Sequence, residues 1–425
     1  MNTQDILGMN ARNQIYVRLN SKEAKKICYS KFETKKLLQK NNIATAKIHY
    51  IISTNDELNR VNWQNLTENF VIKPTNGSGG GGIEVFRQKI NNNTWQTTIN
   101  KNWSLEEIKL HCSDILEGKY STHGSNPQII IEERIPIHPL FLKYTYCGTP
   151  DIRIIVFNNI PVMAMLRIPT KESGGKANLH QGAKGLGIDL ATGVTIHAIT
   201  SNGKNIKFLP GTKKKLSGMM IPFWHQCLIT AVTASQAANL NYCGVDLFIH
   251  KERGPIVVEL NSQPGLSIQL ANQTGLKSRL ERIKNLNVLN CEHGVKICQA
   301  LFASPLANKV TNKDDLTIIS LEEETTILGK NDEKIQILTT IDTGRFRSAI
   351  ASDIAQQLHL VEPEDLLWFQ NSNEGEKIPI IEVKFILKNK KIKSAMIVSQ
   401  KLNKSKYKLK LGRRDLAGFL VKTKN

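Results

Sequence analysis

Hydrophobic and polar positions along the first three quarters of the chain alternate between strand-like and helix-like patterns. Residues 128–135 are an apolar run that ends in charge, which predicts a strand, and residues 151–168 predict a β-hairpin turning at Asn158-Asn159. The apolar stretch at 223–240 has the length of a buried helix and leads into a second predicted hairpin at 242–261. Strands and helices mixed in this order predict an α+β or α/β architecture.

The N-terminal region predicts one long helix. Asn20, followed three residues later by Glu23, has the pattern of a capping box. The apolar positions of residues 22–40 recur at helical spacing. The pattern thus places Lys31 in the middle of a helix.

Beyond residue 303 the pattern changes. Residues 304–315 lose their periodicity and collect Pro, Asn, Lys and Asp, which indicates a linker. Residues 316–425 contain short alternating strands and one predicted helix at 352–358. This segment predicts a separate, mostly-β domain.

A run of small residues at 77–82, GSGGGG, separates two β-rich segments. Gly77, Gly79 and Gly82 satisfy G-x-G-x-x-G, but strand-like residues follow where a dinucleotide site requires a helix. A P-loop is excluded because no Lys-Ser or Lys-Thr pair follows the last glycine. The prediction is a strand, a glycine-rich turn and a returning strand. The tip either folds over a ligand with bare N–H groups or is a linker.

The second hairpin brings acidic residues together. If residues 251–254 form its turn, Asp246 lies directly opposite Glu259, and the two carboxylates repel each other unless a positive group lies between them. Asn261 projects from the same face as Glu259, so three side chains offer the hard oxygen ligands that Mg²⁺ prefers. Lys73, just before the glycine run, is placed to contact a nucleotide phosphate. A solvated acidic face and an ordinary surface lysine are the alternatives.

Composition limits the class of protein and of partner. The chain has 425 residues, 40% hydrophobic and 22% charged, which is ordinary for a globular protein of two or three domains. A formal net charge of +20 suits acidic partners. Residues 388–414 contain eleven Lys or Arg and no acidic residue, and the alternative for them is a solvated lysine-rich face.

The seven cysteines are scattered, without a C-x-x-C, and predict neither a disulfide framework nor a zinc site. The polar N-terminus does not resemble a signal peptide, and the most apolar segment, at 219–234, contains His225 and Gln226 and is too short to span a bilayer. We expect a cytoplasmic protein without a membrane span.

Six sequence motifs follow one another in a fixed order along the first 300 residues. They are Lys31 on a helix, FVIKP with GSGGGG, IIIEERI, DIR, KANLHQG and VVELNSQPGL. In this order they resemble the ATP-grasp carboxylate–amine ligases, and most closely the group related to RimK-type α-L-glutamate ligases, over about residues 5–300. The resemblance implies an α+β ATP-grasp domain at 1–303, with a small lid-bearing part at 48–135 and a core at 136–303.

The resemblance also assigns roles to residues. It implies that nucleotide is bound by Lys31, Lys73, Lys176, Asn178, by a lid of Gly77, Ser78, Gly79, Gly80, Gly81 and Gly82, and around adenine by Glu132, Glu133 and Arg134. Asp246, Glu259 and Asn261 would carry Mg²⁺ or Mn²⁺. Arg153, acting with Asn178, would orient the transferred phosphate.

Two features depart from the family pattern. Only thirty residues precede Lys31, whereas ribosomal-protein glutamate ligases have a long domain there. Lys176 stands where the RimK-type loop usually has arginine, and lysine cannot make the planar two-pronged contact of arginine. The substrate therefore stays open, more than the reaction type.

The C-terminal domain carries a second resemblance. IDTG at 341–344 resembles the aspartic-protease catalytic turn, and LKLGRRDLAGF resembles a segment of retropepsins, as in bacterial retropepsin-like proteins named "ATP-dependent zinc protease". The resemblance covers about residues 318–423 and makes Asp342 the catalytic residue. Such proteases need two carboxylates, so two chains must meet in a homodimer through this domain. Arg345 stands where alanine is usual, and a noncatalytic peptide-binding domain is the alternative.

We therefore expect an ATP-grasp ligase fused to a retropepsin-like domain. The implied reaction uses ATP to convert a carboxylate into an acylphosphate, from which an amine displaces phosphate. The expected partners are an amino acid such as glutamate and an acidic peptide or protein acceptor, and nucleic acid is not required. The alternatives are an aspartic protease with a regulatory ATP site, and a sugar-transfer-associated ATP-grasp ligase acting on sugar or polymer precursors.

Overall fold

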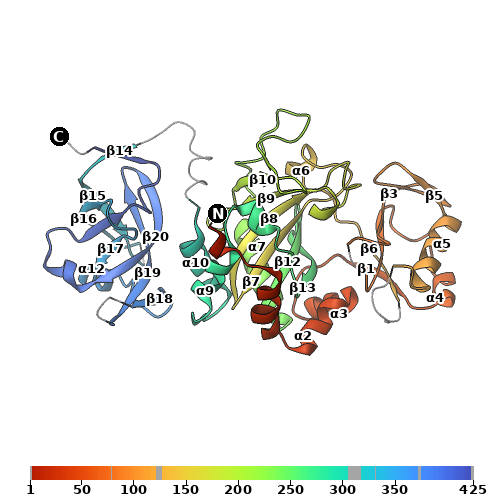
Figure 1. Ribbon diagram of the computed structural model, residues 1–425, viewed down its shortest axis with the longest axis horizontal. Coiled ribbons are helices and arrows are strands. Elements are labelled where there is room, and N and C mark those ends of the chain that lie inside the picture. Colours follow the sequence, from red (N-terminus) through yellow and green to blue (C-terminus); the bar gives the residue numbers. More distant parts are fainter. Residues whose placement is uncertain are drawn as a thin grey trace. The chain divides into compact units, whose positions relative to one another are not determined.

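The structure is a computed structural model that describes residues 2–77, 79–120, 127–304, 317–330, 332–371 and 375–422. The chain divides into two compact units, Met1–Lys284 and Asn285–Asn425 (Figure 1). The division falls earlier than the expected end of the ligase domain at residue 303, because α10 (Cys291–Phe302) contacts β18 (Leu366–Asn371) of the second unit. Residues 305–315 of the predicted linker lie outside the described residues.

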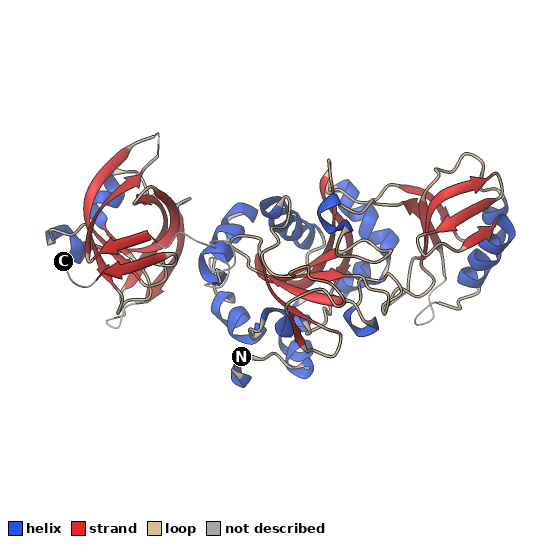
Figure 2. Cartoon of the chain, turned by 90° about the horizontal axis from the view of Figure 1, so that it is seen from above, coloured by secondary structure: helices blue, strands red, loops and turns tan. Residues whose placement is uncertain are grey.

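A six-stranded antiparallel sheet in the first unit has the order β1-β6-β2-β3-β4-β5. Its strands are β1 (Ile48–Ile52), β2 (Phe70–Pro74), β3 (Glu84–Asn91), β4 (Thr94–Thr97), β5 (Asn102–Ser104) and β6 (Ile129–Glu133). Helices α4 (Asn55–Asn59) and α5 (Leu105–Leu116) pack against it (Figure 2). Its core contains a group of aromatic side chains, Trp63, Phe70, Phe86 and Trp95, buried together with aliphatic residues. This sheet holds both ends of the glycine run.

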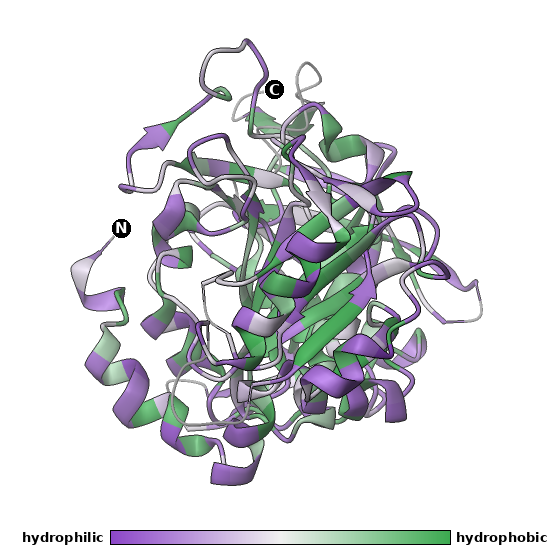
Figure 3. Ribbon diagram, turned by 90° about the vertical axis from the view of Figure 1, so that its right-hand side faces the viewer, coloured by the Kyte–Doolittle hydropathy of each residue, from purple (hydrophilic) through white to green (hydrophobic). Residues whose placement is uncertain are grey.

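A seven-stranded antiparallel sheet in the same unit has the order β11-β10-β9-β8-β7-β12-β13. Its strands are β7 (Asp151–Phe157), β8 (Ile160–Ile168), β9 (Lys184–Ile188), β10 (Thr195–Ile199), β11 (Asn205–Ile206), β12 (Tyr242–His250) and β13 (Gly254–Asn261). It packs against α7 (Trp224–Ala237), α8 (Ile268–Asn272) and α9 (Leu276–Ile283). Every residue of β7 and β8 is buried, so both faces of the sheet are covered there. Figure 3 shows strands coloured largely in the green of hydrophobic residues.

The remaining short elements of the first unit are η1 (Thr3–Asp5), α1 (Met9–Ala11), η2 (Arg12–Tyr16), η3 (Val17–Leu19), α6 (Pro139–Leu142) and η4 (Leu179–Gln181). Among the described residues, no helix has the length and apolar character needed to cross a membrane.

The single helix predicted over residues 22–40 is wrong. Two helices, α2 (Lys22–Tyr29) and α3 (Lys31–Lys40), are separated by Ser30, whose backbone is extended and whose hydroxyl accepts from the Glu33 amide. Serine side chains compete for backbone donors in this way and favour helix N-caps over helix interiors. Lys31 is therefore the first residue of α3 rather than a mid-helix residue.

Both predicted hairpins form, and both contain a β-bulge. The first turns at Asn158-Asn159, where both residues have positive φ, as predicted. In the second, Asp246 pairs with Glu259 as predicted, but the register shifts between Asp246 and Leu247 because Val258 is an extra residue on β13. The predicted turn was one residue too long, since Gly254 already pairs with His250.

The second unit contains a closed β-barrel. Its order is β15-β16-β21-β17-β20-β19, and a β15–β19 pairing closes it. The barrel strands are β15 (Glu322–Leu328), β16 (Lys334–Asp342), β17 (Ala349–Ala351), β19 (Lys377–Leu387), β20 (Lys390–Ser399) and β21 (Leu409–Gly412). Outside the barrel, β18 extends the sheet from β19, and β14 (Thr317–Ser320) pairs in parallel with β22 (Phe419–Lys422). The predicted helix is present as α12 (Ser352–Gln357), and η5 (Gln400–Lys404) follows β20. A mostly-β second unit is thus confirmed.

Candidate active site

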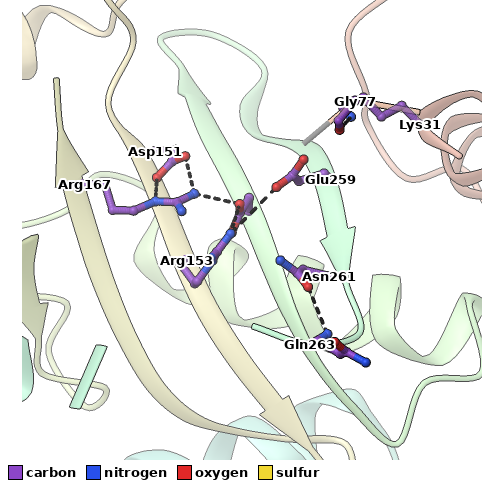
Figure 4. A network of polar contacts seen from close by, with 9 residues as sticks. Lys31, Gly77, Asp151, Arg153, Arg167, Glu259, Asn261 and Gln263 are labelled. Atoms are coloured by element: carbon purple, nitrogen blue, oxygen red, sulfur yellow. Dashed lines mark hydrogen bonds and ion pairs between the residues drawn. The ribbon is translucent and has the colours of Figure 1, made fainter. Parts of the chain in front are cut away.

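Four charged side chains form a buried network on the seven-stranded sheet (Figure 4). Arg153 donates to Asp246 through Nε and Nη2, at 2.7 and 2.6 Å. Arg167 donates to both oxygens of Asp151 at 2.5 Å and to Asp246 Oδ2 at 2.7 Å. Burial alone would raise the pKa of Asp246, but the two guanidiniums hold it below its ordinary value. Asp246 is therefore a charged centre fixed by two arginines.

Glu259 extends this network toward solvent. Arg153 Nη2 lies 2.6 Å from Asp246 and 3.7 Å from Glu259, so a positive group lies between the carboxylates as predicted, and here it is a guanidinium. The Glu259 side chain is 38% exposed, against 2% for Asp246. Partial burial of the Glu259 carboxylate and the charge of Asp246 both raise the pKa of Glu259. Glu259 is thus the accessible carboxylate of the cluster.

The predicted metal ligands meet at this place, but they are not equivalent. Asn261 Oδ1 accepts from the Gln263 amide at 2.9 Å, and Asp246 is engaged by two arginines. Among the described residues, no group of three His, Cys, Asp or Glu side chains is arranged to hold a metal. Asp246, Glu259 and Asn261 nevertheless bring hard oxygen atoms of the kind a divalent cation prefers to one place, among the cationic groups of Arg153, Arg167 and Lys31.

Lys31 links the glycine run to this cluster. Its Nζ donates to the Gly77 carbonyl at 2.7 Å, and its backbone amide donates to Thr75. Burial lowers the pKa of Lys31, Glu259 acts in the opposite direction, and Lys73 lowers it further. Figure 4 shows Lys31 and Gly77 on the Glu259 side of the network. Segments far apart in the sequence therefore converge on one place.

The glycine run forms the predicted turn between β2 and β3, and Phe70 pairs with Phe86 across it. Gly79, Gly80 and Gly82 have φ of 63°, 77° and 72°, which other residues rarely adopt. A Cβ on Gly82 would lie 2.8 Å from the Tyr120 ring. Ser78 lies outside the described residues, and the role of Gly81 stays a prediction.

Side chains from two other segments hold this turn. Gln181 Nε2 donates to the Gly79 carbonyl at 2.8 Å, and His111 Nε2 lies 3.1 Å from the Gly82 carbonyl. Lys176 lies beside Gly80, and its role in nucleotide binding stays a prediction. Asn178 instead caps the short helix η4, accepting from the His180 amide. Neither Gln181 nor His111 was predicted, although Gln181 belongs to the KANLHQG motif.

The acidic end of β6 carries side-chain ion pairs that the sequence did not predict, and its role around adenine stays a prediction. Glu132, expected to serve adenine through its backbone, directs its side chain between Lys73, at 2.6 Å, and Lys35, at 2.9 Å. Lys35 was not predicted. Glu133 pairs with Arg253 at 2.5 Å and accepts from the Lys47 amide. Arg134 follows the end of β6 and is half-buried.

Asp342 ends β16 in the second unit and pairs with Gly412 on β21, so the IDTG and LGRRD segments lie side by side. Asp342 Oδ1 accepts from the Gly344 amide at 3.2 Å. The Arg413 amide donates to the Arg345 carbonyl at 2.9 Å. Within the described residues, Asp342 forms no ion pair with Arg345 or any other cation.

A family model described as sugar-transfer associated ATP-grasp matches residues 10–285. The chain belongs to this family. Membership in an ATP-grasp family supports the ATP-dependent ligase and the fold expected from the sequence for the first unit. It also agrees, at the level of family, with the sugar-transfer alternative. No comparison shows the retropepsin-like identity of the second unit, which stays a prediction.

Relatives of this ATP-grasp chain are named probable α-L-glutamate ligases. The protein from Pseudoalteromonas translucida is 33% identical over 119 residues, which is 28% of each chain. That from Marinobacter nauticus is 52% identical over 46 residues, 11% of this chain and 15% of the relative. That from Saccharophagus degradans is 28% identical over 143 residues, which is 34% of this chain and 33% of the relative. The chain thus spans a third or less of these relatives' length.

Solved structures give weaker comparisons. The D-alanine–D-alanine ligase from Bacillus anthracis complexed with ATP has a TM-score of 0.37 and 15% identity, covering 65% of this chain and 70% of that one. The L-amino acid ligase from Bacillus licheniformis has a TM-score of 0.33 and 14% identity, covering 59% and 43%. TM-scores this low support no conclusion about this ATP-grasp chain.

Proposed function

We propose that the first unit is an ATP-dependent carboxylate–amine ligase that forms an amide through an acylphosphate. The observation that carries the proposal is the position of Lys31. Its ammonium contacts the glycine run at Gly77 and is electrostatically coupled to Lys73 and Glu259. A phosphate held there would meet two lysines, the backbone of a glycine turn and an accessible carboxylate.

In the proposed reaction, Lys31 and Lys73 bind the nucleotide phosphates as cations, and the glycine turn covers them with backbone N–H groups. Lys31 must exchange its bond with the Gly77 carbonyl for a phosphate oxygen, which frees the turn to close. A closed turn excludes water that would hydrolyse an acylphosphate. Holding the two reactants in place can contribute about 7–11 kcal/mol to lowering the barrier.

Glu259 and Asn261 would hold Mg²⁺ or Mn²⁺, with Asp246 as the third oxygen donor if an arginine releases it. Such an ion neutralises charge that develops on the transferred phosphoryl group. Arg153, held by Asp246 and facing Glu259, is placed at the same site and is proposed to orient that group. Asn178 and Lys176 are proposed to contribute from the loop beside the glycine turn.

The proposed substrates are an amino acid that supplies the amine, with glutamate favoured by the names of the relatives, and a peptide or protein carboxylate. The net charge of +20 is compatible with an acidic acceptor. A sugar or polymer precursor is the competing carboxylate, favoured by the family description.

The test is mass spectrometry of products formed from ATP, Mg²⁺ and an amino-acid mixture, with and without glutamate-rich peptides. We expect ADP, phosphate and a new amide whose mass is the sum of both substrates less water. ADP formed at the same rate without any amine or carboxylate would contradict the proposal.

A second function is proposed for the second unit, because the IDTG turn and the LGRRD segment lie side by side. We propose that a homodimer through this unit brings two Asp342 side chains together and trims or holds the acidic product of the first unit. The lysine-rich stretch 388–414 is proposed to attract that product, although Lys388, Lys393, Lys406 and Lys408 already pair with acidic residues.

A further inference from the structure

A buried triad of Lys35, Glu132 and Lys73 lies between α3 and the six-stranded sheet. Lys73 Nζ is 2.6 Å from Glu132 Oε1, and Lys35 Nζ is 2.9 Å from Oε2. Lys73 is 5% exposed, Glu132 is 6% exposed and Lys35 is 1% exposed. Buried charges are stable only when they are paired. One carboxylate between two ammoniums neutralises one of them and leaves an excess of one positive charge in the triad.

The two lysines of the triad face different surroundings. Lys35 also donates to the Ala46 carbonyl at 3.0 Å, which holds its ammonium within the fold. Lys73 lies near the end of β2, just before the glycine turn, and is close enough to Lys31 to lower its pKa. Lys73 is therefore the member of the triad that belongs to the proposed phosphate site.

We propose that Lys35 is a positioning residue for nucleotide binding, which neutralises Glu132 so that Lys73 keeps a net positive charge toward the phosphates. This inference rests on the proposed nucleotide site of the first unit. Lys35 touches no reactant in this account. Without it, Lys73 and Glu132 would form a neutral pair, and a phosphate would meet a dipole instead of a cation.

The same arrangement predicts a dependence on pH. Burial and the Lys73 charge lower the pKa of Lys35 to about 8, while Glu132 and Glu133 act in the opposite direction. As the pH rises through 8, Lys35 loses its proton and Glu132 cancels the charge of Lys73. Nucleotide affinity should therefore fall on the alkaline side. The pKa of Lys31 is also lowered, so variants of Lys35 are needed to separate the two lysines.

The experiment is titration calorimetry of MgATP into the full chain at pH 7 and pH 9. At pH 7, Lys35→Met should weaken binding about tenfold, the scale of one modest charge interaction. Adding Glu132→Gln should restore most of the loss, because Lys73 is then no longer neutralised. Lys35→Arg should keep its affinity at pH 9, since arginine stays protonated. Lys36→Met, exposed on the same helix, is the matched control.

The outcomes distinguish this inference from the function on which it rests. A wild-type chain that does not bind MgATP at either pH would remove the nucleotide site itself. Wild-type affinity at pH 7 in Lys35→Met, or a double variant as weak as the single, would overturn the role of Lys35. If Lys35→Met melts below the assay temperature, the comparison of wild type with Lys35→Arg at pH 9 decides, and an equal loss in both would overturn the inference.

Discussion

The Asp246 cluster of the first unit and the Asp342 turn of the second unit place carboxylates in opposite settings. Asp246 is buried, bonded to two arginines and paired across the hairpin with a second, accessible carboxylate. Asp342 ends a strand and is half-buried, and in the described residues its carboxylate accepts only from the nearby Gly344 amide. The first arrangement brings all its parts together within one chain. The second places one carboxylate at the end of a strand.

This difference shows what motif order can and cannot establish. The first unit has several motifs whose residues converge through strand register, so each supports the others. The second unit has two motifs that are neighbours in one ladder, yet aspartic-protease chemistry needs a second carboxylate sharing a proton. The first unit therefore holds its candidate site within one chain, whereas the proposed protease role of the second unit requires another copy of the chain.

The largest expected effect concerns the buried cluster. Arg167→Met leaves Asp151 without its arginine partner and should lower the free energy of unfolding of the first unit by about 3–5 kcal/mol. Arg253→Met breaks a more exposed pair with Glu133 and should cost no more than about 1 kcal/mol. Urea unfolding followed by tryptophan fluorescence measures both. Equal losses would mean that the cluster is not the integrated structure described above.

The next effect concerns turnover. Glu259→Gln and Asn261→Ala should each reduce ATP turnover by about 10²–10³-fold, because each removes an oxygen donor from the proposed cation site. Circular dichroism checks that the variants fold. Glu252→Gln, exposed at the turn of the same hairpin, should leave turnover unchanged. Full turnover in the Glu259 variant would show that the Asp246 cluster has only a structural role. The cluster would then not differ from the Asp342 turn as proposed above.

A smaller effect is expected at the glycine turn. Gly82→Ala places a Cβ 2.8 Å from Tyr120 at a φ of 72°, so the turn should close poorly and single-turnover chemistry should slow about tenfold. Binding of MgATP should change less. Gly118→Ala has the same kind of backbone strain, with φ of 89°, but meets no atom within 4 Å and serves as the control. Matched rates in the two variants would show that the turn is only a connection.

The smallest effect on the ligase is expected from the second unit. Asp342→Asn should leave ATP turnover unchanged and should abolish any cleavage of glutamate-rich peptides by the full chain. Sedimentation should show a dimer for both proteins, because the interface does not require the carboxylate. A monomeric chain that neither cleaves nor binds such peptides would remove the proposed role of Asp342. Reduced ATP turnover would show that the units are not independent.

Strand register was the most predictable part of the site. The pairing of Asp246 with Glu259 followed from the hairpin pattern, although the assumed turn was too long by one residue and the Val258 bulge compensated for it. The network around Asp151 was missed for a related reason. Val162 is an extra residue on β8, and only the resulting shift places Arg167 opposite Asp151. A bulge leaves little signal in a single apolar strand.

Tertiary contacts of long side chains were less predictable. Lys35 follows Lys31 by four residues on one helix, a spacing that puts both on one face, but a lysine in such a position is usually solvated. Its burial depends on Glu132, which lies far away in the sequence. Helix spacing can indicate the shared face, but only the packed sheet supplies the carboxylate that keeps the lysine inside.

The central claim is that ATP activates a carboxylate as an acylphosphate. The most direct test incubates the full chain with ATP, Mg²⁺, amino acids and glutamate-rich peptides whose carboxylates carry ¹⁸O, and follows the label by mass spectrometry. We predict that one ¹⁸O atom appears in inorganic phosphate for each amide formed, because amine attack leaves the carboxylate oxygen on phosphorus. Amide formed together with phosphate that carries no ¹⁸O, its new oxygen coming only from water, would contradict the account.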